Sequence, residues 1–157
     1  MKSKPETSGN LDRYDIKILA ALSADGRLTL GELAKIVGLS KSPCQVRMKR
    51  LQEERYILGY RAVLNPVKLG RDHIAFVEVR LTDTTEPALD AFNSAVMAVP
   101  EIEQCHMIAG SFDYLLKIRT TGIRSYRQVL GATISNLPNV GSTSTHVAMQ
   151  SVKDDSY

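Results

Sequence analysis

The stretch GLSKSPCQVRMKRL at residues 38–51 is rich in lysine and arginine and holds no acidic side chain. A cationic helix of this kind can neutralise phosphate groups while its polar side chains hydrogen-bond to base edges. The same composition is also typical of a basic helix that only faces water on a small helical bundle. The stretch is therefore a candidate nucleic-acid contact, and its interpretation depends on the elements around it.

Helical spacing divides this stretch into two sides. Cys44, Met48 and Leu51 fall on one side, which we expect to face a core, so Cys44 is predicted to be a small core residue. The opposite side can contact base edges, and the cations beside it can meet phosphates. The residues predicted to bind DNA are Ser40, Lys41, Ser42, Gln45, Val46, Arg47, Lys49 and Arg50, with Arg61 farther along the chain.

Two helices are predicted ahead of the basic one. The segment LDRYDIKILAALSADGR has apolar residues at helical spacing, with Asp12 as its N-cap and Gly26 just past its end. The second helix begins with a capping box between Thr29 and Glu32 and ends at Gly38. Its apolar face is predicted to consist of Leu33, Ile36 and Val37.

The basic helix has two candidate starts, Ser42 and, one turn earlier, Ser40. A helix, a Gly-containing turn and a basic helix match a helix-turn-helix over about residues 30–49. The sequence YILGYRAVLNP that follows is predicted to form a short β-ribbon, or wing, with Arg61 near its tip. Residues 11–71 are therefore predicted to form a winged helix-turn-helix domain.

The remaining chain alternates between strands and helices. Strands are predicted at 73–81, 101–109, 112–120 and 142–152, and helices at 86–99 and 123–138. A tight turn at Gly110 and Ser111 joins the second strand to the third. The order βαββαβ is that of a ferredoxin-like domain, which we assign to residues 72–157. The fold class is therefore α+β, and residues 1–10 are expected to be a flexible arm.

Two helices can cover only one face of a four-stranded sheet. The predicted strands hold too many apolar residues for half of them to be left in water. We therefore expect at least a homodimer that forms through the sheets, which would also suit a helix-turn-helix that reads two half-sites. The apolar residues counted for this expectation are Val77, Val79, Leu116, Ile118, Val147 and Met149.

The two predicted domains also differ in charge. Residues 1–70 hold 13 Lys and Arg against 7 Asp and Glu, whereas residues 71–157 hold 7 Lys and Arg against 10 Asp and Glu. A basic first half suits a polyanion such as double-stranded DNA.

No enzyme motif is recognisable in the sequence. Cys105 and His106 adjoin on a predicted strand, so they point to opposite faces and cannot act as a nucleophile and its base. Two cysteines are too few for a disulfide framework or a zinc cage, and no stretch resembles a membrane span or a secretory signal. We expect a cytoplasmic, nucleoid-associated protein that is not an enzyme and needs no metal or cofactor.

Two long stretches resemble the leucine-responsive regulatory protein (Lrp)/AsnC family of transcriptional regulators. They are LDRYDIKILAALSADGRLTLGELAKIVGLSKSPCQVRMKRLQEERYILGYRAVLNP and IEQCHMIAGSFDYLLKIR with YRQVLGATISNLPNVGSTSTHVAMQSVK, and they cover nearly everything after residue 10. Two positions depart from the family pattern: Arg55 stands where Gly is usual, and Ser111 where many members have an acid. The resemblance implies dimers that assemble into octamers or similar rings, wrap DNA and sense a small molecule, usually an amino acid.

The resemblance also implies an effector site in the second domain, between dimers. Asp113 could pair with an effector's ammonium group, and the Gly110 turn and nearby hydroxyls could donate to its carboxylate. The alternative is a turn in which Asp113 bonds local backbone, beside threonines that favour a strand. The residues carried over are Ala109, Gly110, Asp113, Tyr114, Ser142, Thr143 and Thr145.

We therefore predict a sequence-specific transcriptional regulator of amino-acid metabolism, either an activator or a repressor. A single acid at Asp113 suits a neutral effector such as leucine or proline, because a basic amino acid would need a second acid where Ser111 stands. One alternative is a nucleoid-organising protein with little effector response. Another is a regulatory or enzymatic subunit whose first domain docks onto protein instead of DNA.

Overall fold

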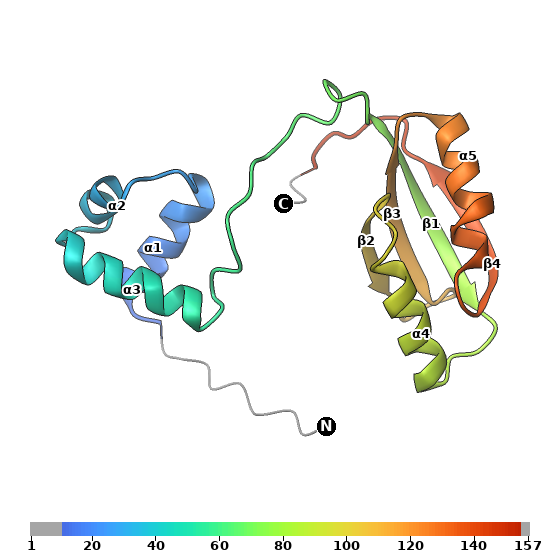
Figure 1. The fold of residues 1–157 in the computed structure, drawn as a ribbon, viewed down its shortest axis with the longest axis horizontal. Helices are drawn as coiled ribbons and strands as arrows, with labels where there is room; N and C mark the ends of the chain where they lie inside the picture. Colours follow the sequence, from blue (N-terminus) through green and yellow to red (C-terminus); the bar gives the residue numbers. More distant parts are fainter. Residues whose placement is uncertain (1–10, 155–157) are drawn as a thin grey trace. The chain divides into compact units, whose positions relative to one another are not determined.

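The described part of the chain forms two compact units that divide between Val63 and Leu64 (Figure 1). The computed structural model describes residues 11–154, so the arm predicted at residues 1–10 lies outside the described residues. The core of the first unit lies between helices, and the core of the second lies between a sheet and its helices. This arrangement confirms the α+β class.

Helix α1 (Arg13–Ala24) begins with a reciprocal capping box. The Asp12 side chain accepts hydrogen bonds from Tyr14 N–H and Asp15 N–H, and the Asp15 side chain accepts from Asp12 N–H. Asp12 is thereby confirmed as the N-cap, whereas the role of Asp15 was not foreseen. The helix ends at Asp25, whose extended backbone closes it before Gly26 is reached.

Helix α2 (Leu30–Val37) has the predicted ends. Thr29 and Glu32 form the capping box, and Gly38 ends the helix in the left-handed region at φ 77°. The predicted apolar face is wrong at one position, because Ile36 is exposed and Ala34 is buried in its place. Ala34 follows Leu33 and precedes Val37 by three positions, so it falls on the same face of the helix.

Helix α3 (Lys41–Glu53) begins after Ser40, which confirms the earlier of the two candidate starts. Pro43 is then the third helical residue, where a missing N–H is tolerated because the first four amides of a helix have no partner within it. Cys44 and Leu51 are fully buried and Met48 packs against the same core, as predicted. Just after the helix, Arg55 adopts a left-handed conformation with φ 62°.

The predicted β-ribbon at residues 56–66 is wrong, because no strand forms between residues 54 and 72. The chain leaves α3 as an extended segment (green in Figure 1), and Leu58, Val63 and Leu64 along it are exposed. A two-stranded ribbon by itself is only marginally stable in water. The three helices of this unit offer it no third strand, and its apolar side chains Leu58, Val63 and Leu64 are not packed against them.

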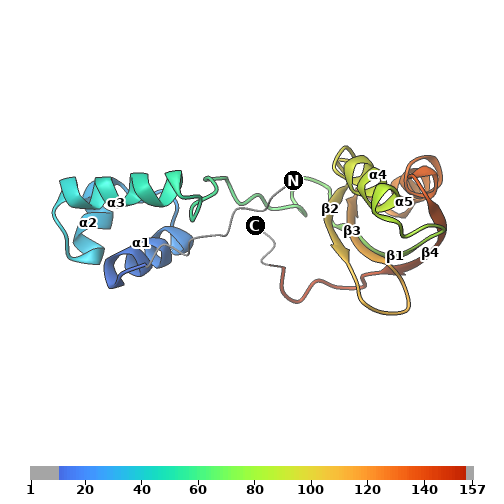
Figure 2. The ribbon, with the colours of Figure 1, turned by 90° about the horizontal axis from the view of Figure 1, so that it is seen from below.

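The second unit is an antiparallel four-stranded sheet with the strand order β2-β3-β1-β4. Its strands are β1 (His73–Leu81), β2 (Ile102–Met107), β3 (Tyr114–Thr120) and β4 (Val140–Val147). Helices α4 (Glu86–Val96) and α5 (Ile123–Ala132) lie on the same side of the sheet (Figure 2), and a short 3-10 helix, η1 (Ile134–Asn136), follows α5. The predicted βαββαβ order is confirmed.

Several predicted elements of this unit are longer than the observed ones. The second and third strands are joined by the six-residue loop 108–113 instead of a two-residue turn, and Ile108 N–H donates to the Asp113 carbonyl across its base. The helix predicted at 123–138 breaks after Ala132 into η1. The last strand ends at Val147, and Met149 beyond it is exposed.

The apolar residues counted for the expected dimer lie mostly on one face of the sheet, so they do not by themselves require a second protomer. Val77 and Val79 share one face of β1, and the register pairs Val77 with Leu116 on one side and with Thr145 on the other. Because alternate strand residues share a face, most of the counted residues lie beneath the helices. The face that the helices leave open carries Ile74, Phe76 and Leu115 among charged and polar groups. Residues on it include Glu78, Arg80, Lys117, Arg119, His106 and His146.

Candidate DNA-binding face and effector loop

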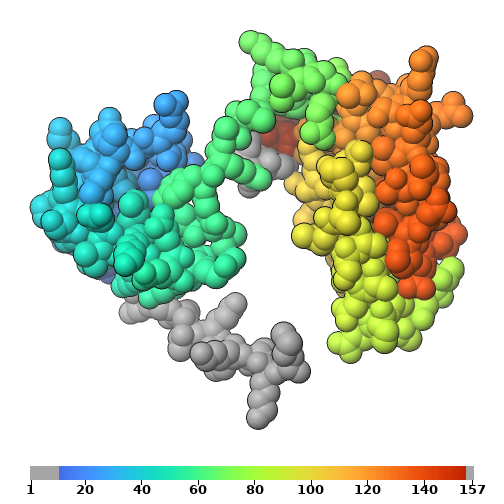
Figure 3. Space-filling view, in the orientation of Figure 1, coloured from blue at the N-terminus to red at the C-terminus, as the bar shows by residue number. Residues whose placement is uncertain are grey.

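The outward side of α3 is exposed, as the helical spacing predicted. Ser42 and Gln45 face water, and the side chains of Val46 and Lys49 are 69% and 75% exposed. In Figure 3 the atoms of α3 (teal) form a continuous part of the surface of the first unit. The Lys49 ammonium lies 3.6 Å from Glu53, one turn along the helix, an exposed pair that contributes little to stability.

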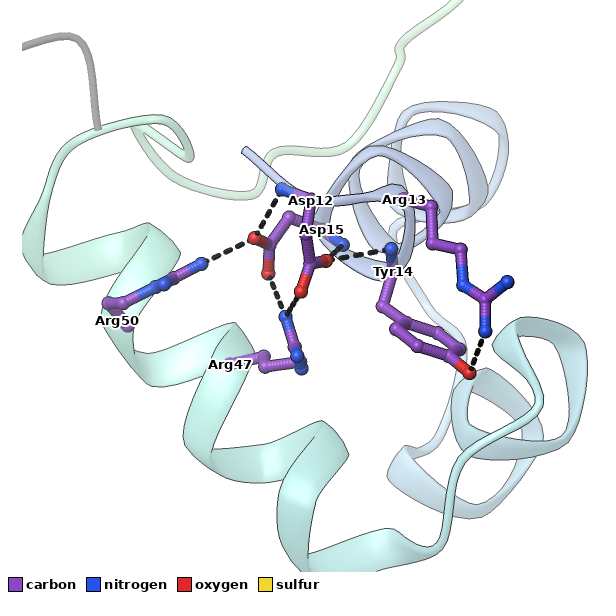
Figure 4. Close-up of polar contacts among 6 residues, drawn as sticks. All are labelled: Asp12, Arg13, Tyr14, Asp15, Arg47 and Arg50. Atoms are coloured by element: carbon purple, nitrogen blue, oxygen red, sulfur yellow. Dashed lines mark hydrogen bonds and ion pairs between the residues drawn. The ribbon is translucent and has the colours of Figure 1, made fainter. Parts of the chain in front are cut away.

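Arg47 and Arg50 do not extend freely from α3. The Nη1 atom of Arg47 lies 2.6 Å from Asp12 and 2.9 Å from Asp15, and the Nη2 atom of Arg50 lies 2.6 Å from Asp15 (Figure 4). Both arginines were predicted to flank the base-reading side and meet phosphates. The structure instead gives each guanidinium group a carboxylate partner at the start of α1, and contact with phosphate stays a prediction.

The two acids of this cluster differ in burial. The Asp15 side chain is 1% exposed and that of Asp12 is 46% exposed. Burial by itself would raise the pKa of Asp15, but hydrogen bonds from Asp12 N–H, Arg47 and Arg50 outweigh it and hold this pKa below the ordinary value. The pKa of Asp12 is also lowered, chiefly by the hydrogen bond from Asp15 N–H. Both carboxylates are therefore charged at neutral pH.

Sequence reasoning missed Asp15 as part of the site, although a signal was present. The apolar spacing of the first helix admitted either Tyr14 or Asp15 at one core-facing position, and an acid there needs a cation. Arg47 and Arg50, three residues apart on a neighbouring helix, supply it. Beside the cluster lies a hollow of about 480 Å³, which is lined by Asp12, Asp15, Pro43, Val46, Arg47 and Arg50.

The remaining residues predicted to bind DNA are exposed at two separate places. Ser40 and Lys41 stand at the start of α3, next to its outward side. Arg61 lies in the extended segment that was expected to form the wing. The structure thus keeps the residues of α3 together and places Arg61 apart from them in the chain, with no ribbon to position it.

The predicted effector residue Asp113 has an intramolecular partner. Its Oδ2 atom accepts a 2.7 Å hydrogen bond from Leu81 N–H, and its own N–H donates to the Val79 carbonyl. The carboxylate thus bonds backbone of β1 and not of its own loop, and its contact with an effector stays a prediction. Gly110 and Ala109 are exposed in the same loop.

The predicted effector residues of β4 lie across β1 from this loop. Strand β1 separates the loop 108–113 from β4, and two strand spacings amount to roughly 10 Å. Ser142 lies opposite Arg80 and Thr143 opposite Val79, so these two point to different faces of the sheet. The Thr145 hydroxyl is 2.6 Å from the hydroxyl of Tyr126.

Tyr114, another predicted effector residue, has a buried side chain. It is buried beneath the helices, with its ring centroid 4.5 Å from that of Phe92. Tyr114 begins β3 directly after Asp113. Because strand side chains alternate between the two faces, that of Tyr114 points into the core.

Cys44 is a core residue, as predicted, and Cys105 is half-buried against the core of the second unit. Burial raises the pKa of both the Cys44 and the Cys105 thiol, so a smaller fraction of each is in the reactive thiolate form. Within residues 11–154, no group of three or more His, Cys, Asp or Glu side chains is placed to hold a metal ion. No helix among these described residues has the length and apolar character needed to cross a membrane.

Both units match known protein families. Residues 74–157 match the family described as the Lrp/AsnC ligand binding domain, and residues 11–57 match a family described as winged helix-turn-helix DNA-binding. The second match ends where the expected ribbon would have begun.

Similar full-length proteins are also known. The chain is 65% identical over 145 residues to a proline dehydrogenase transcriptional activator of Rhizobium radiobacter, covering 92% of this chain and 93% of that protein. It is 44% identical over 151 residues to the leucine-responsive regulatory protein of Escherichia coli strain K12, covering 96% and 92%. Its structure resembles that of a transcriptional regulator from Neisseria meningitidis in complex with L-methionine, with a TM-score of 0.85, 31% identity and coverage of 92% and 93%.

Proposed function

Because this chain belongs to the Lrp/AsnC family of DNA-binding transcriptional regulators, we propose that it controls genes of amino-acid metabolism and that a small neutral amino acid sets its activity. It acts in the cytoplasm, on the nucleoid, as a regulator and not as an enzyme. It works as a homodimer or a larger homo-oligomer, which is the arrangement the resemblance implies. This proposed assembly rests on membership of the family, because the apolar residues of the strands do not by themselves require a second protomer.

We propose that α3 is the recognition helix of the helix-turn-helix. The observation that carries this proposal is its exposed side, where Gln45, Val46 and Lys49 project from a helix whose other side is locked into the core. A rigid helix with polar and cationic side chains on its free side suits the major groove. Arg50 serves the fold instead, since its partner Asp15 is buried.

Two variants of α3 test this proposal. Gln45→Ala should relax base preference and cost about 1–3 kcal/mol of binding to the target site if Gln45 makes a bidentate base contact. Lys49→Ala should weaken binding to all sequences and reduce the slope of log K against log salt by about 0.9 if Lys49 meets one phosphate. Unchanged DNA binding in both variants, with folding intact, would remove α3 from the interface.

For the effector we propose proline or leucine, bound at the loop 108–113. The similarity to a proline dehydrogenase activator favours proline. Asp113 supplies the only acid in the loop, so the site offers one charge for an ammonium group and no second charge for a basic side chain. Because β1 separates this loop from Ser142 and Thr143, we propose that those hydroxyls reach the effector from a second copy of the chain.

Two substitutions of Asp113 separate its charge from its structural role. Asp113→Asn keeps an oxygen that can accept from Leu81 N–H, whereas Asp113→Ala loses both the acceptor and the charge. If the charge binds the effector's ammonium, both variants lose about 1.5–3 kcal/mol of binding by calorimetry. If the residue only supports the loop, Asp113→Asn binds the amino acid as the wild type does, and tighter binding of lysine than of leucine would defeat the proposed specificity.

The rival within DNA binding is a nucleoid-organising role with little effector response. DNA affinity measured with and without proline or leucine decides between them. An affinity that neither amino acid changes would favour the rival, whereas a shift that Asp113→Asn abolishes would support the proposed function.

A further inference from the structure

In the first unit, two carboxylates form ion pairs with the two arginines that flank the exposed side of α3. Arg47 contacts Asp12 and Asp15 through one nitrogen, Nη1, while Arg50 contacts only Asp15 among the pairs observed. The acids belong to the start of α1 and the arginines to α3 (Figure 4). A phosphate group would seek the same guanidinium hydrogens as these carboxylates.

We propose that Asp12 limits the affinity of this protein for DNA by competing with the phosphate backbone for Arg47. The proposal rests on the proposed contact between α3 and DNA. Arg47 then engages phosphate only at the expense of its pairing with Asp12. The consequence is weaker binding to DNA of every sequence, because phosphate contacts carry no base preference.

The carboxylate partners, and not the exposure of the arginines, distinguish Arg47 as the exchangeable cation from Arg50 as the fixed one: Arg50 is itself 43% exposed, but Asp15 is buried. Arg47 and Asp12 are 28% and 46% exposed, so a phosphate can replace the Asp12 carboxylate without leaving a charge buried. Exposed ion pairs contribute only about 0–1 kcal/mol, which a new phosphate contact can offset. Asp15 is buried, and leaving it without a cation would cost far more. Arg50 therefore stays with Asp15 when DNA binds.

The Tyr14 ring also stabilises Arg47 in the position where it pairs with Asp12 and Asp15. The Arg47 guanidinium carbon lies 5.5 Å from the centroid of this ring, within the range of a cation–π contact. Arg13 stacks on the same ring at 4.7 Å and also donates to the Tyr14 hydroxyl. The start of α1 thus binds the Arg47 guanidinium group through the Tyr14 ring and two carboxylates, of which that of Asp12 is the exposed one.

Asp12→Asn removes this charge and keeps the helix cap. Asparagine caps helices about as well as aspartate, so its side-chain oxygen can still accept from Tyr14 N–H and Asp15 N–H. The matched control is Asp25→Asn, an exposed acid in the same unit whose oxygen accepts from Arg27 N–H. Both variants raise the net charge by one, and only Asp12→Asn loosens Arg47.

The experiment measures the affinity of the full-length variants for a short duplex of mixed sequence over a series of salt concentrations. Asp12→Asn should bind several-fold tighter than Asp25→Asn at low salt, and its slope of log K against log salt should be steeper by up to about 0.9, the value for one additional phosphate contact. Adding Arg47→Ala to Asp12→Asn should abolish both gains. A merely structural role of Asp12 would move stability but would not steepen the salt slope.

Two results would overturn the role of Asp12: equal slopes for Asp12→Asn and Asp25→Asn, or a gain that persists after Arg47→Ala. Failure of the proposed α3 contact is recognised separately, through Gln45→Ala and Lys49→Ala. If neither substitution changes the affinity for DNA, the proposed function fails and the inference fails with it. If binding depends on Lys49 and yet Asp12→Asn behaves as Asp25→Asn does, only the inference fails.

Discussion

Each unit contains a cluster of two acids and two cations, but the buried member differs. In the first unit Asp15 is 1% exposed, and its partners Arg47 and Arg50 reach water. In the second unit Lys117 and Arg119 are buried on the open face of the sheet, and their partners Glu103 and Asp154 are partly exposed. One cluster therefore keeps its cations partly exposed to solvent, and the other withdraws its cations from solvent.

The difference predicts which substitutions damage the fold. A charge at the surface that loses its partner is solvated by water, whereas a buried charge that loses its partner has no such compensation. Removal of an acid should thus be tolerated in the first cluster at Asp12 and costly in the second at Asp154. The second cluster also ties Asp154 of the C-terminal segment to Lys117 and Arg119 on the sheet.

The largest expected effect is that of Asp154→Ala. Asp154 lies 2.6 Å from Lys117 and 2.7 Å from Arg119, and its loss leaves two buried cations that share Glu103. We expect the second unit to lose about 2–3 kcal/mol, near the lower limit for a broken buried ion pair because Glu103 remains. Amide hydrogen exchange resolved by unit measures this loss.

The control for this prediction is Asp90→Asn, which removes one negative charge from an exposed position of α4 in the same unit. Its effect should stay within about 0.5 kcal/mol, as for other exposed substitutions. Equal effects of Asp154→Ala and Asp90→Asn would show that the buried cations are solvated easily, and the contrast between the two clusters would then lose its basis.

A smaller loss is expected for Asp15→Asn. The variant weakens the hydrogen bonds from Arg47 and Arg50, but both arginines can turn towards water. We expect the first unit to lose about 1–2 kcal/mol, less than a fully buried pair would. Chemical denaturation followed by exchange in α1 and α3 should show this loss, with Asp25→Asn as the reference. No loss would mean that the cluster does not hold these helices together.

The same cluster predicts acid sensitivity of the first unit. The pKa of Asp15 is lower in the folded chain than in the unfolded one, so its stabilisation is fully present above the unfolded value of about 3.9 and is lost as the pH falls towards the folded pKa. Wild-type stability should therefore fall below about pH 4. The fall should be shallower in Asp15→Asn, and parallel pH profiles for the two proteins would contradict this assignment.

The sequence predicted local structure well where one residue decides it. Gly38 ends α2, Thr29 caps it, and the alternation of Val77 and Val79 marks a strand, because each of these effects acts within a few residues. The exposed side of α3 followed from helical spacing for the same reason. The family resemblance then supplied the functional class.

What escaped prediction depends on partners distant in the chain. Asp15 and Arg50 are 35 residues apart, and no local rule connects them. The expected ribbon did not form, because no further strand supports it. The Asp113 carboxylate accepts a hydrogen bond from Leu81 N–H, 32 residues away. The error about the open sheet face was avoidable, since residues of equal parity such as Val77 and Val79 must share a face.

A last contrast between the units concerns two residues in left-handed backbone conformations. Arg55 in the first unit and Asn139 in the second both have φ 62°. Asparagine adopts this region more readily than arginine does. Asn139 also has a local role, since its carbonyl accepts from Thr82 N–H at 2.7 Å and its side chain donates to the Ala88 carbonyl at 3.4 Å. The conformation is thus strained at Arg55 and supported at Asn139.

The smallest predicted effect follows from this contrast. Arg55→Gly should stabilise the first unit by about 0.5–1 kcal/mol, because glycine relieves the strain but gives up part of the gain through a more flexible unfolded chain. Asn139→Gly should instead destabilise the second unit slightly, because the side-chain hydrogen bond is lost and little strain is relieved. Thermal unfolding of both variants checks the two signs, since stabilisation raises the midpoint. A lower midpoint for Arg55→Gly would mean that the arginine side chain contributes more at the end of α3 than its backbone strain costs.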